Sequence, residues 1–100
     1  MTRQAEEVLA KNRFEQVDEK QDDAITLSLR KEGDDAVGTV TCPAALSGGK
    51  LPSDMTSGRV PAKDAFRAAI RMGNEMKAPV VVMDPDAVWQ AEWGDLYRPV

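Results

Sequence analysis

Histidine is absent from this chain, and cysteine occurs once, at Cys42. Without an imidazole there is no Ser-His or Cys-His nucleophile, no general base with an unperturbed pKa near neutrality, and no metal site with histidine ligands. We therefore expect a protein without a complete catalytic constellation and without a cofactor. Cys42 precedes Pro43 and has no histidine to activate it, so we expect a small, inert core residue.

Export and membrane signals are also lacking. The N-terminus opens with polar and charged residues instead of an apolar signal sequence. No apolar stretch approaches the ~20 residues that cross a bilayer, and a lone cysteine cannot form an internal disulfide. These absences predict a cytoplasmic protein without membrane contact.

Aromatic residues make up only 5% of the chain, so aliphatic and methionine side chains must supply most of the buried surface. The hydrophobic fraction of 42% and the charged fraction of 30% are those of an ordinary globular protein. A chain of 100 residues is long enough for one core and too short for two. We expect residues 1–100 to form a single domain.

The net charge of −4 is unevenly distributed. Residues 1–36 carry ten acids and six bases, residues 37–78 carry three acids and six bases, and residues 79–100 carry four acids and one base. Either the blocks neutralise each other across the folded surface, or the basic middle forms a binding face. We favour the first interpretation.

Two contrasting segments open the chain. Residues 2–14 have the spacing of a short helix that begins at a Thr2 cap. Residues 15–23 are nearly all charged or amide and indicate a solvated linker. We expect the segment 1–23 to pack loosely, because its helix carries few apolar residues: Ala5, Val8 and Leu9.

A β-hairpin follows. Residues 24–31 alternate between apolar and polar, the pattern of a half-buried strand, and residues 36–42 form a second β-rich run after a Gly-Asp turn. Gly38 inside the second strand is the expected place of a bulge. We expect these two strands to pair antiparallel.

Residues 43–58 contain two prolines, three glycines and three serines, and we expect a long flexible loop. Because a structureless loop of this length is uncommon in a compact domain, it is mobile, functional or the host of a short element around Leu46 or Leu51. The run Ser47-Gly48-Gly49-Lys50 resembles the end of a phosphate-binding loop, but the match does not extend beyond these residues. Ala44 stands where the first glycine belongs, and Leu51 where the Ser or Thr belongs.

The strongest pattern lies further along. Residues 61–77 form a continuous apolar stripe at helical spacing, with proline at the start. The apolar run 80–83 comes directly after and indicates a central, buried strand. Asp84-Pro85 then resembles a helix cap, so we expect a short helix over residues 85–93, stopped by Gly94.

These elements predict an α+β domain of two layers. A small mixed sheet of three strands, the hairpin plus the strand after the main helix, packs on one long amphipathic helix, with short N- and C-terminal helices. If residues 36–42 and 79–83 are neighbours, the intervening loop and helix form the crossover that parallel pairing needs. A sheet of only three strands leaves an edge strand with unpaired backbone groups. Two copies of the chain would form a homodimer if these edges paired with each other.

A basic strip along the main helix is the first candidate site. Such a row is able to track phosphates, but its long side chains equally suit a solvated helix face, which we favour because the chain is acidic overall. No aromatic alternates with the bases to stack on nucleobases. The strip comprises Arg59, Lys63, Arg67, Arg71 and Lys77.

Asp84 and Asp86 follow the buried strand, at the position where open α/β sheets bind ligands, and two carboxylates are a weak candidate for a Mg²⁺ site. We favour helix capping for both, because no further ligand completes a metal site. Trp89, Trp93 and Tyr97 recur every four residues and would share one face of a continued helix. They are candidates for a protein interface, although so few aromatics are also needed in the core.

The sequence resembles no family closely enough to name one. We favour a small, non-catalytic binding or regulatory module that acts through protein–protein contacts with an unidentified partner. The alternatives are nucleic-acid binding through the basic helix face, and a metal-dependent enzyme using Asp84 and Asp86. Fold alone does not decide among them.

Overall fold

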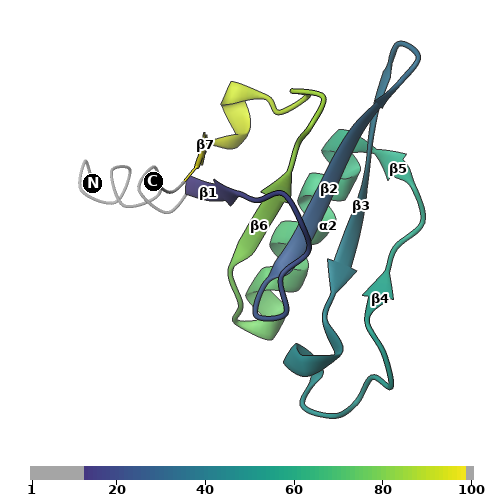
Figure 1. Cartoon of the computed structure of the whole chain (residues 1–100), viewed down its shortest axis with the longest axis vertical. Coiled ribbons are helices and arrows are strands. Elements are labelled where there is room, and N and C mark those ends of the chain that lie inside the picture. The colour runs from purple at the N-terminus through teal and green to yellow at the C-terminus, as the bar shows by residue number, and fades with distance from the viewer. Residues whose placement is uncertain (1–12, 99–100) are drawn as a thin grey trace.

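The computed structural model describes residues 13–98. Over this range, seven strands form one mixed sheet, and helix α2 lies behind it in Figure 1. The strands lie in the order β4-β3-β2-β6-β1-β7, and β5 also pairs with β3. The α+β class, the mixed sheet and the single main helix are confirmed. The prediction of only three strands is wrong.

The hairpin forms as predicted from β2 (Ile25–Glu32) and β3 (Asp35–Cys42). Its turn is Gly33-Asp34, and Gly33 takes the positive φ of 61° that a two-residue hairpin turn requires. The apolar side chains of β2 are fully buried on the face toward α2: Ile25, Leu27 and Leu29. Alternation alone therefore identified the buried face of this strand.

Gly38 forms no bulge, contrary to the prediction. The antiparallel register continues unbroken through the pair Leu29 and Gly38. A Cβ at position 38 would lie 2.8 Å from the Cβ of Ala65 in α2. The glycine therefore lets helix and sheet approach closely.

Helix α2 (Ala62–Met76) confirms the predicted main helix. Its buried residues are all small: Ala62, Ala65, Ala69 and Gly73. Pro61 is the N-cap rather than the first helical residue, and Lys77 ends the helix with a positive φ of 54°. The small residues bring the helix axis close to β2 and β3, so the long side chains beside them remain only partly covered.

Strand β6 (Val80–Met83) is central, as predicted, and pairs parallel with β2 on one side and β1 on the other. Its neighbour in the hairpin is β2 and not β3. The outer edge of β3 is instead occupied by β4 (Met55–Thr56) and β5 (Val60–Pro61).

The N-terminal prediction is partly wrong. Residues 1–12, which contain most of the expected first helix, lie outside the described residues. Arg13 and Phe14, its last two positions, belong instead to β1 (Arg13–Gln16), as do the first two residues of the expected linker. Phe14 is 7% exposed, so its burial beside β6 decides the local structure.

The C-terminal helix over residues 85–93 is absent from the structure. Only Ala91–Trp93 form a 3-10 helix (η2), followed by β7 (Asp95–Tyr97), which pairs parallel with β1. The backbone leaves the right-handed helical region at Ala87, whose φ is 55°. The proline signal after Asp84 therefore marks a turn and not a helix start.

The segment 43–58 holds two short elements, a 3-10 helix (η1, Ala44–Ser47) around Leu46 and strand β4. Among residues 13–98, no helix is both long and apolar enough to cross a membrane.

Candidate functional site

Four aromatic rings from three parts of the chain pack together beside the first turns of α2. Trp93 stacks on Phe66 with ring centroids 4.9 Å apart, and Trp89 meets Phe14 edge-on at 5.3 Å. The Trp89 indole N–H donates to the carbonyl oxygen of Gly94 at 3.0 Å. Both tryptophans are partly buried against the main core. Their contacts belong mainly to the fold.

Tyr97, the third predicted interface aromatic, lies elsewhere. It pairs with Glu15 in the sheet, one position from Phe14, so it faces away from α2. The residue is 38% exposed, and the Arg13 guanidinium lies over its ring at 4.7 Å from the centroid. The three aromatics therefore share no helix face, because residues 89–97 do not form one continuous helix.

Asp84 holds the turn that follows β6. It is 6% exposed, and its two carboxylate oxygens accept the backbone N–H groups of Val88 at 2.8 Å and Trp89 at 3.0 Å. Asp86 accepts the backbone N–H of Lys31 at 2.9 Å. Asp84 is thus held by backbone amides of the turn that follows it, and Asp86 by a backbone amide of β2. Within residues 13–98, no three His, Cys, Asp or Glu side chains gather as metal ligands.

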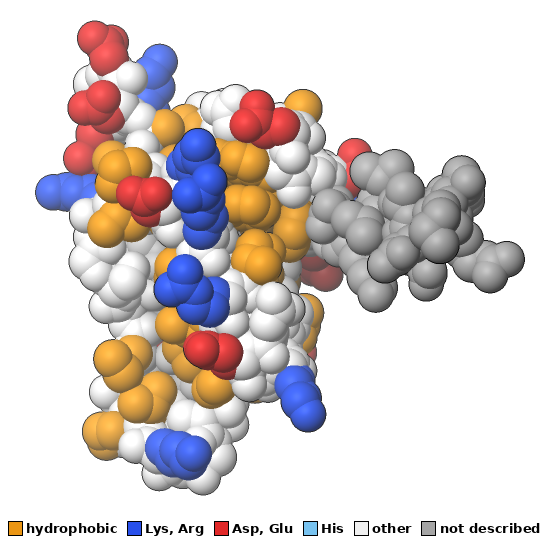
Figure 2. Space-filling view, turned by 180° about the vertical axis from the view of Figure 1, so that it is seen from behind, with side chains coloured by type: hydrophobic (Ala, Val, Ile, Leu, Met, Phe, Trp, Pro, Cys, Tyr) orange, Lys and Arg blue, Asp and Glu red, His pale blue; other side chains and the backbone are white. Residues whose placement is uncertain are grey.

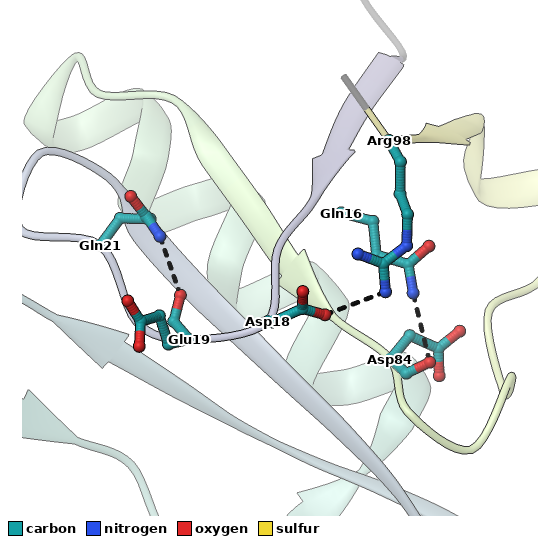
Figure 3. A network of polar contacts seen from close by, with 6 residues as sticks. All are labelled: Gln16, Asp18, Glu19, Gln21, Asp84 and Arg98. Atoms are coloured by element: carbon teal, nitrogen blue, oxygen red, sulfur yellow. Dashed lines mark hydrogen bonds and ion pairs between the residues drawn. The ribbon is translucent and has the colours of Figure 1, made fainter. Parts of the chain in front are cut away.

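Polar contacts join the carboxyl end of β1 to those of β6 and β7, as Figure 3 shows. The Gln16 amide donates to the carbonyl oxygen of Asp84 at 3.4 Å, and Arg98 donates to the Asp18 carboxylate at 3.0 Å. The hydrogen bond and the charge of Arg98 lower the pKa of Asp18. Both side chains of this ion pair are largely exposed, so it contributes little to stability.

The basic strip is shorter than predicted. Arg59 lies in the chain before β5 and pairs with Glu32 at 2.5 Å, and Lys77 caps the end of α2. Lys63, Arg67 and Arg71 remain, exposed along α2, with no ion pair to any residue of the described range. Figure 2 shows Lys and Arg side chains in a row down this face of the molecule, with hydrophobic side chains on both sides.

An apolar hollow that the sequence patterns did not predict lies where the second half of α2 meets the segment after β3. Its volume is about 530 Å³. Lys50 and Glu75 are the charged residues that line it, and Cys42, 5% exposed, lies at its inner wall. Its apolar walls, together with Cys42, define what we call the methionine groove: Leu46, Leu51, Met55, Met72 and Met76.

Hydrogen bonds within the segment 43–54 fix the wall of the methionine groove. The Ser47 hydroxyl donates to the carbonyl oxygen of Ala44 at 2.7 Å and accepts the N–H of Leu51 at 3.0 Å. Asp54 accepts the N–H of Ala44 at 2.9 Å. The sequence carried two signals for this groove. They are the isolated apolar residues in a Gly- and Ser-rich stretch and the methionines of the main helix. Their meeting depends on tertiary structure.

Comparisons of the chain with protein-family models, with curated proteins and with solved structures give no match.

Proposed function

We propose that this protein is a small, non-catalytic module that binds a protein partner through the methionine groove. The observation that carries the proposal is an apolar hollow of about 530 Å³ with Met55 at its wall, 57% exposed. Concave, mainly apolar surfaces with a few polar groups are the usual form of binding sites.

The composition of the groove favours a peptide side chain as the occupant. Three of its wall residues are methionines, whose unbranched, polarisable side chains adapt to irregular apolar shapes. Surfaces rich in methionine are common where a protein accepts partner segments by repacking. The wall itself is held by Ser47 and Asp54 through backbone hydrogen bonds, so part of the ordering cost of binding is met before the partner arrives.

The test combines peptide selection with methyl NMR. A random peptide library is selected on the immobilised full chain, and the bound peptides are titrated into protein labelled at its methionine methyl groups. We expect the resonances of Met55, Met72 and Met76 to shift together. Met83 is the internal control, because its strand pairs place it on the opposite face of the sheet.

A matched pair of variants checks the location. Met55→Lys replaces an exposed apolar wall residue with a charged one and should weaken peptide binding about ten-fold or more, since the peptide would have to displace the water that hydrates the ammonium. Ser53→Lys adds the same charge to an exposed neighbour that does not line the groove, and binding should be unchanged. The site would be excluded if the selected peptides shifted only the resonance of Met83, or if they bound Met55→Lys as tightly as the unmodified protein.

The proposal has two further parts, a candidate partner and a location. A second copy of the chain is one candidate partner, through pairing between sheet edges. Strands β4 and β5 cover parts of one edge, so such a pairing would use the other edge, which is the three-residue strand β7. The proposed location is the cytoplasm, for which the lone Cys42 is the supporting feature.

A further inference from the structure

We infer that the segment this protein binds is an acidic amphipathic helix that lies along α2. Its carboxylates meet Lys63, Arg67 and Arg71, and an apolar side chain enters the methionine groove. This inference rests on the proposed function, because it names the chemistry of the partner that the groove takes.

Charge is the first argument. Lys63, Arg67 and Arg71 are exposed and lie in the block 37–78, which carries six bases and three acids, whereas the rest of the chain is acidic. None of the three pairs with an acid of the described part of the chain. An unneutralised cationic row on an acidic protein favours an anionic partner and selects against cationic ones.

Spacing is the second argument. The three bases are four residues apart, so they form one row along α2, about 12 Å long at 1.5 Å per residue. A partner helix with acids at i, i+4 and i+8 presents carboxylates at the same interval.

Continuity with the groove is the third argument. Glu75, the next position of the row after Arg71, lines the methionine groove, and so do Met72 and Met76. The basic row and the apolar hollow therefore form one surface along the same helix. A helix of about 15 residues spans both, because 15 residues cover about 22 Å. Its apolar anchor lies one or two turns beyond its last acid.

The same surface suits nucleic acid less well. Three bases on a chain of net charge −4 neutralise few phosphates. Phe66, which lies on the same helix as the row, stacks on Trp93, so one face of each of these rings is already occupied. The methionine groove is also an apolar hollow, which a phosphate backbone does not fill.

The test is a selection from a display library of helical peptides with randomised surface positions, on the immobilised full chain. We expect the enriched sequences to carry Asp or Glu at i, i+4 and i+8, followed by Leu, Phe or Met. Their binding should fall about ten-fold in the variant Arg67→Glu, Arg71→Glu, since attraction becomes repulsion at two positions. The variant Lys20→Glu, Lys31→Glu changes the net charge equally at exposed sites outside α2 and should bind normally.

A charge exchange makes the test specific. A synthetic peptide from the selection, with its acids replaced by Lys, should bind the Arg67→Glu, Arg71→Glu variant more tightly than the unmodified protein. This recovery is not expected from a variant that is merely misfolded. Peptides whose acids are replaced without any change in affinity would overturn the inference.

The outcomes separate the inference from the proposed function. If the enriched peptides are neutral and still shift Met55, Met72 and Met76, the groove binds peptides and the acidic-helix inference is wrong. If no enriched peptide shifts these methionines, the proposed function fails as well. Retention of a ~20 bp DNA duplex at ~50 mM salt, lost in the Arg67→Glu, Arg71→Glu variant, would assign the basic row to nucleic acid and overturn the inference.

Discussion

The indole of Trp93 stacks on the ring of Phe66, with the centroids 4.9 Å apart and the planes inclined by 8°. This contact fastens the segment after β6 to α2, although the helix expected over residues 85–93 does not form. Trp89 joins it edge-on, at 5.2 Å from Trp93 and 5.5 Å from Phe66. The aromatic pattern in the sequence therefore marks a packing cluster that forms without helical spacing.

The first prediction concerns these tryptophans. Trp89→Ala should lower the free energy of unfolding by about 3 kcal/mol and Trp93→Ala by about 2 kcal/mol, because both rings are packed but only partly buried. Tyr97→Ala, at a more exposed position, should cost less than about 1 kcal/mol. Urea denaturation followed by circular dichroism measures all three. A loss for Tyr97→Ala that exceeds both tryptophan values would contradict the assignment of the cluster to the fold.

The second prediction concerns the close approach of helix and sheet at Gly38. Gly38→Ala should destabilise the protein by about 1–3 kcal/mol, because its Cβ would lie 2.8 Å from the Cβ of Ala65, and neither atom is able to rotate away. Gly58→Ala is the matched control, since its Cβ would have no neighbour within 4 Å. It should be neutral or stabilise by about 0.5 kcal/mol. Thermal unfolding measures the change in stability of both variants, and equal changes would refute the steric argument.

The third prediction concerns Asp84. Asp84→Ala leaves the N–H groups of Val88 and Trp89 without their acceptor and should cost about 2–3 kcal/mol. Amide hydrogen exchange at both residues should accelerate, whereas Asp84→Asn, which keeps one carbonyl acceptor, should lose less.

Metal titration tests the alternative role of Asp84 and Asp86. Because their carboxylates already accept backbone N–H groups, we expect millimolar Mg²⁺ to leave the amide resonances of residues 84–89 in place. Saturable shifts confined to these residues would favour the metal-dependent alternative.

The fourth prediction concerns pH. The hydrogen bond from Arg98, together with its charge, holds the pKa of Asp18 below the ordinary value of 3.8. The pair therefore stabilises the fold at pH values above 3.8, and this stabilisation is lost as the pH falls through the lowered pKa of Asp18. In Arg98→Gln, the pKa of Asp18 should rise toward 3.8, as NMR titration of its carboxyl carbon measures. Arg13→Gln, which removes a guanidinium that pairs with Asp95, should leave it unchanged.

Local patterns predicted the hairpin, the main helix and the central strand, because each pattern matches the period of its element. They failed where burial or a turn overrides local preference. Phe14 joins β1 because the sheet buries its side chain, and the segment after Asp84 turns away because its carboxylate accepts N–H groups four and five residues on. Of the candidate residues, Lys63, Arg67 and Arg71 do form a row, whereas Arg59 and Tyr97 lie apart from the predicted partners.

The sequence by itself determined the α+β class, the pairing of β2 with β3 and the buried stripe of α2, since alternation and helical spacing are local properties of the chain. Only the tertiary structure decided that residues 13–98 form a sheet of seven strands, that Gly38 serves a close contact rather than a bulge, and that Leu46, Leu51 and Met55 meet Met72 and Met76 in one groove. Those features depend on residues far apart in the sequence, which meet only when the chain folds; at Gly38 the meeting is possible because small residues let α2 approach the sheet.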